Sequence, residues 1–402
     1  MSGDNVWIIG VSMTPFKRYK DKDLIDLASE ACIAALDDAG ATVKDMDILA
    51  SGNLYEANAG VGQRIQKQIG QTGIPVYNVS NACATGATAF RTVYMAIKAG
   101  EAEMGLAVGS EQMGKMGMLG AGRQARKEEL VYEPSGRYGA VMGTEGILGT
   151  NLMPGTFAQA GMEYAYEHGG VGFEQFAKVA EKNHAHSVLN PLAQYRKQFS
   201  LDEIMGGEVI AYPNTLLMCC PTGDGAAAAV LVSEEKLRSL PAEVQRRAVK
   251  VSASVMTSDP YVDGGQVNFD VNTLTRRAAD KAYAIAGVDP KDLDLVELHD
   301  CFATAELLHY DNLRLCEPGA AGEWIDKRGP WRDGEIPVNV SGGLLSKGHP
   351  LGATGIANIF EVSTHLRGEA GDRQIDGAKV GLTHVIGLGS ACAIHILERA
   401  AS

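Results

Sequence analysis

A cysteine among small residues is the strongest candidate nucleophile of the chain. Cys83 stands in the sequence NACATG (81–86). A short run rich in β-formers precedes it at 74–80, and apolar residues at helical spacing follow it from 87 to 98. This order predicts a strand-to-helix junction, where free backbone N–H groups and the positive helix end stabilise a thiolate. The alternative is a packing cysteine, because free cysteines mostly serve as small buried hydrophobic residues.

A histidine in a glycine-rich stretch is the candidate base for this thiol. His349 lies in KGHPLGATG (347–355), where three glycines allow backbone to line a narrow site. An imidazole next to a thiol can accept its proton and hold the resulting thiolate. The alternative is a histidine that caps a surface loop.

A third cluster follows a predicted strand at 293–298. The sequence ELHDCFATAE (297–306) offers a hydrogen-bond donor in His299, a titratable thiol in Cys301 and a carboxylate in Glu306. Parallel α/β sheets carry their ligands at the carboxyl ends of strands, where these side chains are expected. A metal site built from His299, Asp300 and Cys301 is an alternative, but adjacent residues chelate one ion poorly. We therefore predict no metal.

The elements that must position these residues alternate between strand and helix. Runs at 6–12 and 46–51 read as buried strands, and 24–39 reads as a helix that ends at Gly40. This alternation predicts an α/β layered fold.

An internal repeat organises the rest of the chain. AGATVKDMDIL (39–49) aligns without a gap with AGVDPKDLDLV (286–296), and the Ala-Thr-Gly of 84–86 returns at 353–355. We predict two similar halves about a pseudo-two-fold axis, which would bring the loops of Cys83 and His349 together. The first half comprises 1–113 and 214–242, an inserted loop domain occupies 114–213, and the second half comprises 243–402.

Composition excludes several classes of function. The net charge of −13 over 402 residues argues against nucleic-acid binding, because a phosphate backbone would be repelled. Seven cysteines with no C-x-x-C pair indicate reduced thiols. No run approaches the ~20 apolar residues that span a membrane, and the first residues lack a secretory signal. We expect a cytoplasmic protein without a membrane span.

The motifs together resemble a known superfamily. NACATG (81–86), HDCF (299–302), GHPLGATG (348–355) and the glycine-rich terminal strand look like the four catalytic loops of the thiolase superfamily. HDCF, with NHAHS (183–187) and CCPTGDGAA (219–227), resembles the sterol-carrier-protein (lipid-transfer-protein) type of thiolase. The resemblance implies duplicated α/β halves in five layers (αβαβα), with an inserted loop domain and usually a homodimer.

The resemblance also implies a mechanism. Cys83, activated by His349, would attack the keto carbon of a 3-oxoacyl-CoA and become acylated. The charge of the leaving enolate would be held by His349 and a group on the loop of His299. Backbone N–H groups of Cys83 and Gly387 would form a second oxyanion hole. The activity would be thiolysis with coenzyme A, or Claisen condensation in reverse, with coenzyme A as co-substrate and no bound cofactor.

One departure concerns the second acid/base. Ordinary thiolases carry a cysteine just before the glycines of the last loop, whereas this chain has Val385 there. The resemblance implies that Cys301 replaces it.

The phosphates of coenzyme A need local cations in a chain of negative net charge. Four basic residues are candidates: Arg123, Arg126, Lys127 and Lys182. A solvated helix face explains these charges as well.

Other functions remain open within the same fold. One is a thiolase-fold aldolase, and another is a non-catalytic acyl-CoA or lipid-binding protein. Partner-dependent relatives, such as benzoylsuccinyl-CoA and acetoacetyl-CoA thiolases, also raise the hypothesis of a small zinc-ribbon/OB-fold partner subunit.

Overall fold

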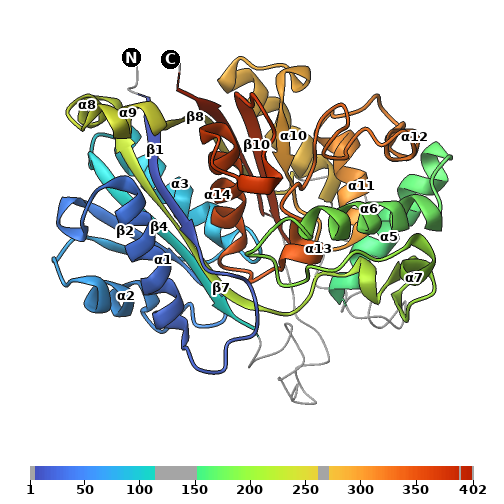
Figure 1. Ribbon diagram of the computed structural model, residues 1–402, viewed down its shortest axis with the longest axis horizontal. Coiled ribbons are helices and arrows are strands. Elements are labelled where there is room, and N and C mark those ends of the chain that lie inside the picture. The colour runs from blue at the N-terminus through green and yellow to red at the C-terminus, as the bar shows by residue number, and fades with distance from the viewer. Residues whose placement is uncertain (1–4, 114–151, 261–270, 389–390, 401–402) are drawn as a thin grey trace.

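The computed structural model describes residues 5–113, 152–260, 271–388 and 391–400. Its centre is a nine-stranded mixed sheet in the order β3-β2-β4-β7-β1-β8-β11-β10-β9 (Figure 1). The two halves of the chain meet where Trp7 and Ile8 of β1 pair with Lys250 and Val249 of β8. The strands are β1 (Val6–Met13), β2 (Ile48–Gly52), β3 (Val76–Val79), β4 (Met104–Gln112), β7 (Asp224–Ser233), β8 (Val249–Thr257), β9 (Leu295–Glu297), β10 (Val380–Gly387) and β11 (Ala391–Arg399).

The strand order and local contacts match an internal duplication. Outward from the join, the first half runs β1, β7, β4, β2, β3 and the second runs β8, β11, β10, β9, so that the first four strands of each half correspond. The aligned segments form the same structure, a 3-10 turn followed by a strand, at 43–45 before β2 and at 290–292 before β9. The Asp47 carboxylate accepts hydrogen bonds from the N–H groups of residues 103 and 104, and Asp294 does the same at 379 and 380.

Helices pack on both faces of each half of the sheet and produce five layers. Helix α1 (Leu24–Ala39) packs against β1, β4 and β7 on the outer face of the first half, and α10 (Val271–Ala286) packs against β8 and β11 of the second. Helices α3 (Thr85–Lys98) and α14 (Thr354–Arg367) contact each other and lie between the halves. The expected α/β fold and αβαβα layering are therefore confirmed.

The alternation of β7 explains the separation of the layers. Ala226, Ala228 and Val230 belong to the apolar cluster under α1, whereas Ala227 and Ala229 belong to the cluster around α3 and α14. Because successive side chains of a strand point to opposite faces, this apolar run fills two cores at once.

The described part of the insertion packs on the second half. Helix α5 contacts α11, and α6 contacts α11, α12 and α13 (Figure 1). The sequence attached this segment to the first half, but its neighbours in space belong to the other. The remaining elements are α2 (Val61–Ile69), α5 (Leu152–His168), α6 (Phe173–Ser187), α7 (Leu201–Met205), β5 (Val209–Ala211), β6 (Asn214–Thr215), α8 (Glu234–Arg238), α9 (Ala242–Arg247), α11 (Ala303–Asn312), α12 (Ala321–Asp326) and α13 (Gly343–Lys347).

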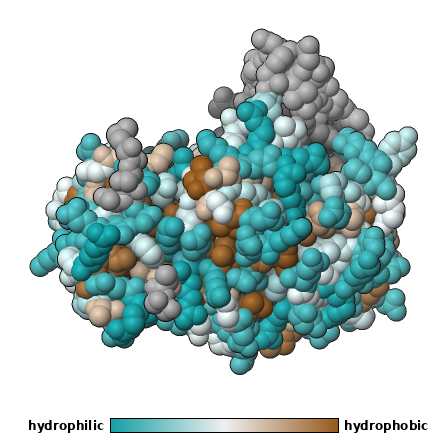
Figure 2. Space-filling view, turned by 90° about the horizontal axis from the view of Figure 1, so that it is seen from above, coloured by the Kyte–Doolittle hydropathy of each residue, from teal (hydrophilic) through white to brown (hydrophobic). Residues whose placement is uncertain are grey.

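The surface is mainly polar on the face shown in Figure 2, with hydrophobic residues scattered between hydrophilic ones. Among the described residues, no helix has the length and apolar character needed to cross a bilayer.

Candidate active site

Cys83 lies between β3 and α3, as the sequence predicts. The turn before it is unusual, because Ala82 adopts a φ of 47° in the left-handed region. The Thr85 hydroxyl donates to the Ala82 carbonyl at 2.6 Å and accepts from the Asn81 N–H at 2.8 Å. These bonds hold the turn and present Cys83 just ahead of the helix.

The two Ala-Thr-Gly segments meet at the starts of α3 and α14. A Cβ placed on Gly86 would lie 2.5 Å from the carbonyl oxygen of Gly352, and one on Gly355 would lie 2.3 Å from the backbone nitrogen of Ala87. Both positions require glycine because the backbones approach so closely. The predicted convergence of the Cys83 and His349 loops is thus confirmed by geometry.

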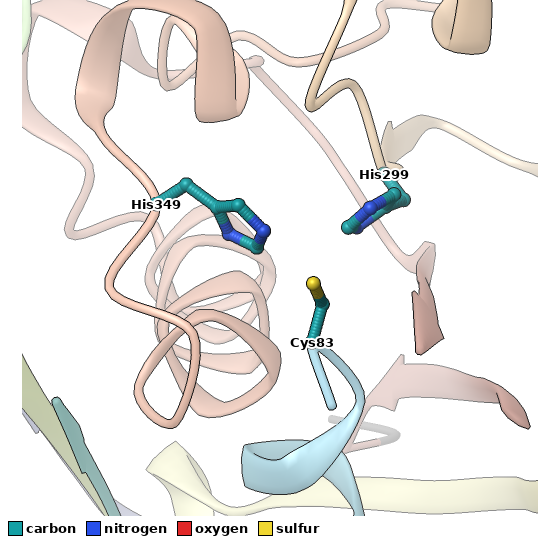
Figure 3. Close-up of side chains that lie close together, drawn as sticks. All are labelled: Cys83, His299 and His349. Carbon is teal, nitrogen blue, oxygen red and sulfur yellow. The ribbon is translucent and has the colours of Figure 1, made fainter. Parts of the chain in front are cut away.

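Three potential donor atoms converge at this junction. One ligand atom each from Cys83, His299 and His349 lies within 4.8 Å of the other two, and all three residues are buried. Figure 3 shows the Cys83 sulfur pointing toward the two imidazoles, which come from separate loops. The ring centroids of His299 and His349 are 5.2 Å apart.

A hydrogen-bond chain fixes the tautomer of His349. The Thr354 hydroxyl donates its single proton to the Pro350 carbonyl at 3.0 Å. Its oxygen therefore accepts from His349 Nδ1, 2.7 Å away, so that Nδ1 carries the proton. The remaining nitrogen, Nε2, is unprotonated and has no hydrogen-bond partner among the described residues. His349 Nε2 is thus free to act as a base.

Burial keeps the resting site neutral. It raises the pKa of Cys83 to about 12, although hydrogen bonds from the N–H groups of Cys83 and Leu388 oppose the rise. Burial also lowers the pKa of His349 well below its usual value and lowers that of His299 to about 3. Desolvation therefore outweighs the helix end, which the sequence expected to stabilise a thiolate.

A small apolar pocket surrounds the cluster. The volume open to the centre of a water-sized sphere is about 30 Å³, which is room for about two water molecules. Cys301 lies in its wall, as predicted, together with Cys220 of the CCPTGDGAA motif. The other lining residues are Tyr55, Met153, Phe157, Phe302, Leu351 and Leu388.

The HDCF loop is held by an extensive buried network. Asp300 accepts from the N–H groups of Leu344 and Leu345 at the start of α13, at 2.7 and 3.2 Å. The Cys301 carbonyl accepts from the N–H of Cys220 at 3.0 Å. Asp300 thus ties the loop of His299 to the helix that leads into His349.

Lys182 and Glu306 have structural roles. The Lys182 ammonium lies 2.8 Å from a Glu306 carboxylate oxygen, and both side chains are fully buried. Asn183 and Asn339 donate to the same carboxylate. The prediction that Lys182 binds coenzyme A is therefore wrong, because its charge is already paired and inaccessible.

The other predicted site residues divide in two. Arg123, Arg126 and Lys127 lie outside the described residues. Gly387 packs closely on Asn81, since a Cβ there would lie 2.2 Å from the Asn81 carbonyl oxygen. The backbone N–H on that loop that acts on the Cys83 sulfur belongs to Leu388, the next residue.

Some residues of the site were missed by the sequence analysis. Thr354 could have been found from the internal repeat, because it aligns with Thr85 in the repeated Ala-Thr-Gly segment. The Thr85 side chain also acts through its hydroxyl. His384 carries no such signal. Its Nδ1 accepts from the His299 N–H at 3.4 Å, and its ring lies 4.6 Å from that of His309.

Comparisons with known proteins agree with this geometry. The family model described as "Thiolase, N-terminal domain" matches residues 6–198, and "Thiolase C-terminal domain-like" matches 266–399. The chain belongs to the thiolase family. Within this family it is 39% identical to "Sterol carrier protein 2" of Oryctolagus cuniculus over 400 residues, which is 98% of this chain and 72% of that protein.

Two further relatives of this chain are named as enzymes. "Acetyl-CoA acetyltransferase" of Methanothermobacter thermautotrophicus is 35% identical over 401 residues, with 98% of this chain and all of that protein covered. "Benzoylsuccinyl-CoA thiolase subunit BbsB" of Thauera aromatica is 30% identical over 388 residues, with 96% and 95% covered.

Solved structures confirm the thiolase fold. The "Ltp2-ChsH2(DUF35) aldolase" matches with a TM-score of 0.80 at 21% identity, covering 99% of each chain. Human mitochondrial 3-ketoacyl-CoA thiolase in complex with CoA matches with a TM-score of 0.71 at 19% identity, covering 99% of this chain and 98% of that one. At these identities the likeness concerns the fold alone.

Proposed function

We propose that this chain is an acyl-CoA C-acyltransferase that cleaves a 3-oxoacyl-CoA with coenzyme A, or runs the reverse Claisen condensation. The observation that carries the proposal is the cluster of the Cys83 thiol with two imidazoles within 4.8 Å. One imidazole, that of His349, has its proton fixed on the far nitrogen and a free Nε2. A nucleophile beside a correctly oriented base is the arrangement that covalent catalysis requires.

In the first half-reaction, His349 Nε2 takes the Cys83 proton and the sulfur bonds to the keto carbon of the substrate. The bond between C2 and C3 then breaks, and its electron pair passes to the enolate of the leaving acyl-CoA. The imidazoles of His299 and His349 stabilise the enolate oxygen by hydrogen bonding. The Cys301 thiol protonates C2, and the released acyl-CoA leaves an acyl group on Cys83.

In the second half-reaction, the Cys301 thiolate takes the proton of the coenzyme A thiol. The coenzyme A sulfur attacks the acyl carbon, and Cys83 leaves as a thiolate that is protonated by His349. Backbone N–H groups of Cys83 and Gly387 would stabilise the oxyanion in this step. The neutral resting pair fits such a cycle, because His349 Nε2 takes the Cys83 proton as the sulfur bonds to the keto carbon, so that no free thiolate accumulates.

The pocket indicates the part of the substrate that binds there. Apart from the two imidazoles, its walls are mainly apolar side chains and thiols, which favours an apolar acyl group over a charged one. Arg123, Arg126 and Lys127 are the proposed cations for the coenzyme A phosphates.

An acyl adduct on Cys83 is the decisive test. The enzyme is incubated with a panel of 3-oxoacyl-CoAs and digested, and the peptide that contains Cys83 is weighed by mass spectrometry. We expect an adduct with the mass of the substrate's acyl group, discharged by coenzyme A. Cys83→Ala should abolish the adduct and its transfer to coenzyme A. Cys392→Ala, at a buried cysteine outside the pocket lining, is the matched control and should form the adduct as the wild type does.

The same experiment distinguishes the other functions of this fold. A retro-aldol cleavage needs no acylated thiol, so turnover of a β-hydroxyacyl-CoA that survives Cys83→Ala would indicate an aldolase. Binding of acyl-CoA with neither adduct nor turnover would indicate a non-catalytic carrier. Either result contradicts the acyltransferase proposal.

We further propose that the chain forms a homodimer through β3. This strand is at the edge of the sheet, and its Tyr77 side chain is 51% exposed. An exposed edge strand is a ready site for pairing with another chain. Sedimentation of the wild type and of Tyr77→Lys should show a dimer that the substitution weakens, and a monomeric wild type would refute this.

A small zinc-ribbon/OB-fold subunit is the second proposed partner. The benzoylsuccinyl-CoA relative is named as a subunit, and the aldolase structure is named for two components. Thiolysis by the chain expressed alone should be weak and should rise when such a subunit is added. Full activity of the purified chain alone would rule the requirement out.

A further inference from the structure

The Cys83 cluster holds two nitrogen atoms and one sulfur atom that could also bind a metal ion. Among the described residues, His349 Nε2 and His299 Nδ1 are buried without any hydrogen-bond partner. A buried polar nitrogen without a partner is uncommon and costs free energy, so it calls for a ligand. The third donor is the sulfur of Cys83, and one atom from each residue lies within 4.8 Å of the others.

We propose that Cys83, His299 and His349 form a Zn²⁺ site whose occupation blocks the nucleophile. Zn²⁺ binds thiolate and imidazole together, and three protein ligands with one open position is a familiar zinc arrangement. Mg²⁺ and Ca²⁺ prefer oxygen ligands, which this cluster does not supply. On binding, the Cys83 thiol releases its proton to solvent and its sulfur bonds to the ion, with no change of oxidation state.

The spacing of the donors suits this ion after a small adjustment. With Zn–S near 2.3 Å and Zn–N near 2.1 Å, tetrahedral ligand atoms are roughly 3.3 to 3.7 Å apart. The three atoms here lie within 4.8 Å of one another, so side-chain rotations that shorten each separation by at most about 1.5 Å would close the site. The three loops come from both halves of the chain, and their donor atoms lie together at this junction.

The surroundings of the cluster support an ion of positive charge. Thr354 accepts the Nδ1 proton of His349, which orients the ring and leaves Nε2 as the ligand atom. The buried Glu111 carboxyl interacts electrostatically with the Cys83 sulfur, and a bound cation would favour its ionised form. The pocket of about 30 Å³ has room for a water molecule as the fourth ligand.

The consequence is competition between a metal ion and the substrate. A sulfur bonded to Zn²⁺ cannot attack a carbonyl carbon, and an acylated sulfur cannot bind the ion. The metal site needs only these three side chains and does not depend on the proposed acyl transfer. Failure of one therefore leaves the other to be judged on its own experiment.

The test uses Co²⁺ as a spectroscopic substitute for Zn²⁺. The full chain is freed of metal with a chelator, desalted and titrated with Co²⁺ without oxygen. We expect one equivalent to bind, with thiolate-to-cobalt charge-transfer absorption in the near ultraviolet and tetrahedral bands in the visible. Added Zn²⁺ should abolish these bands, and Mg²⁺ at the same concentration should not.

Variants locate the site. Cys83→Ala should remove the charge-transfer band, and His299→Ala and His349→Ala should each weaken Co²⁺ binding at least tenfold. Cys392→Ala and His395→Gln, at a buried thiol and a buried imidazole outside the pocket lining, are the matched controls and should bind as the wild type does. Circular dichroism verifies that each variant is folded.

A second measurement needs no variant. Alkylation of Cys83 by iodoacetamide, read by peptide mass spectrometry, should slow at least tenfold with one equivalent of Zn²⁺ and recover when a chelator is added. Unchanged labelling, absence of the cobalt bands, or bands that persist in Cys83→Ala would each overturn the proposal.

Discussion

The tautomer of His349 gives the sharpest test of how the thiol is activated. Thr354→Val keeps the shape of the side chain and removes the oxygen that accepts from His349 Nδ1 at 2.7 Å. The resting hydrogen bond is between neutral groups and contributes about 1 kcal/mol, whereas a bond from a charged imidazolium contributes about 1.5–3 kcal/mol. Since only the increase on charging the ring lowers the barrier, the expected loss is about 0.5–2 kcal/mol, or roughly two- to thirtyfold in rate.

The assay follows alkylation of Cys83 by iodoacetamide, together with thiolysis once a substrate is found. The rate constant of alkylation and kcat should fall by this factor, while KM stays near the wild-type value because Thr354 lies behind the imidazole. Thr364→Val is the matched control, since this threonine is on the same helix, is also buried and donates to the Glu361 carbonyl. Rates within twofold of wild type, or an equal loss in the control, would refute the argument.

Three further predictions follow from the site and its support. In His349→Ala, where no imidazole takes the proton, alkylation of Cys83 should accelerate about tenfold per pH unit from pH 7 to 9, because burial raises the pKa of the thiol to about 12; a plateau below pH 8 would contradict a neutral resting thiol. Glu306→Gln should lower the urea-unfolding free energy by about 3–5 kcal/mol, because it leaves the buried Lys182 charge unpaired, and a loss below 1 kcal/mol would argue against the ion pair. Gly355→Ala should cost about 1–3 kcal/mol by overpacking, whereas Gly172→Ala, whose Cβ would meet only the Gln175 side chain at 3.6 Å, should cost less.

The position of Cys83 could be predicted because its signal is local. A run of β-formers, a small-residue turn and a helical pattern follow one another in the chain, and the structure has β3, the Ala82 turn and α3 there. The meeting of Cys83 with His349 needed the repeat in addition. Once two halves of the same fold are inferred, equivalent loops near the axis must approach each other, which a single pattern along the chain cannot reveal.

Burial of charged side chains could not be predicted. Lys182 follows helical spacing next to polar residues, which resembles a solvated face, and only the packing of α6 on α11 shows that it is enclosed. The insertion belongs to the first half in the chain but contacts the second in space, because the apolar faces of α5 and α6 fit the helices after the HDCF loop. Such choices depend on contacts between distant segments.

The thiolate expectation failed for a related reason. A helix end stabilises a negative charge by a modest free energy, and the position of the helix end can be predicted from the sequence. Desolvation depends on how completely the two halves enclose the sulfur, and this appears only in three dimensions. The two effects oppose each other at Cys83, and the larger one is invisible in the sequence.

The division of the site between the two halves links folding to chemistry. Cys83 comes from the first half, whereas His299, Cys301 and His349 come from the second, and neither set has a nucleophile with its base. The glycine contacts between Gly86, Gly352 and Gly355 set the distance between the halves. A substitution that separates the halves by even 1 Å would lengthen the path from the sulfur to Nε2 and slow proton transfer. Reactivity of Cys83 therefore measures the docking of the two halves, and the alkylation rate should fall in Gly355→Ala even where the helices and sheet remain folded.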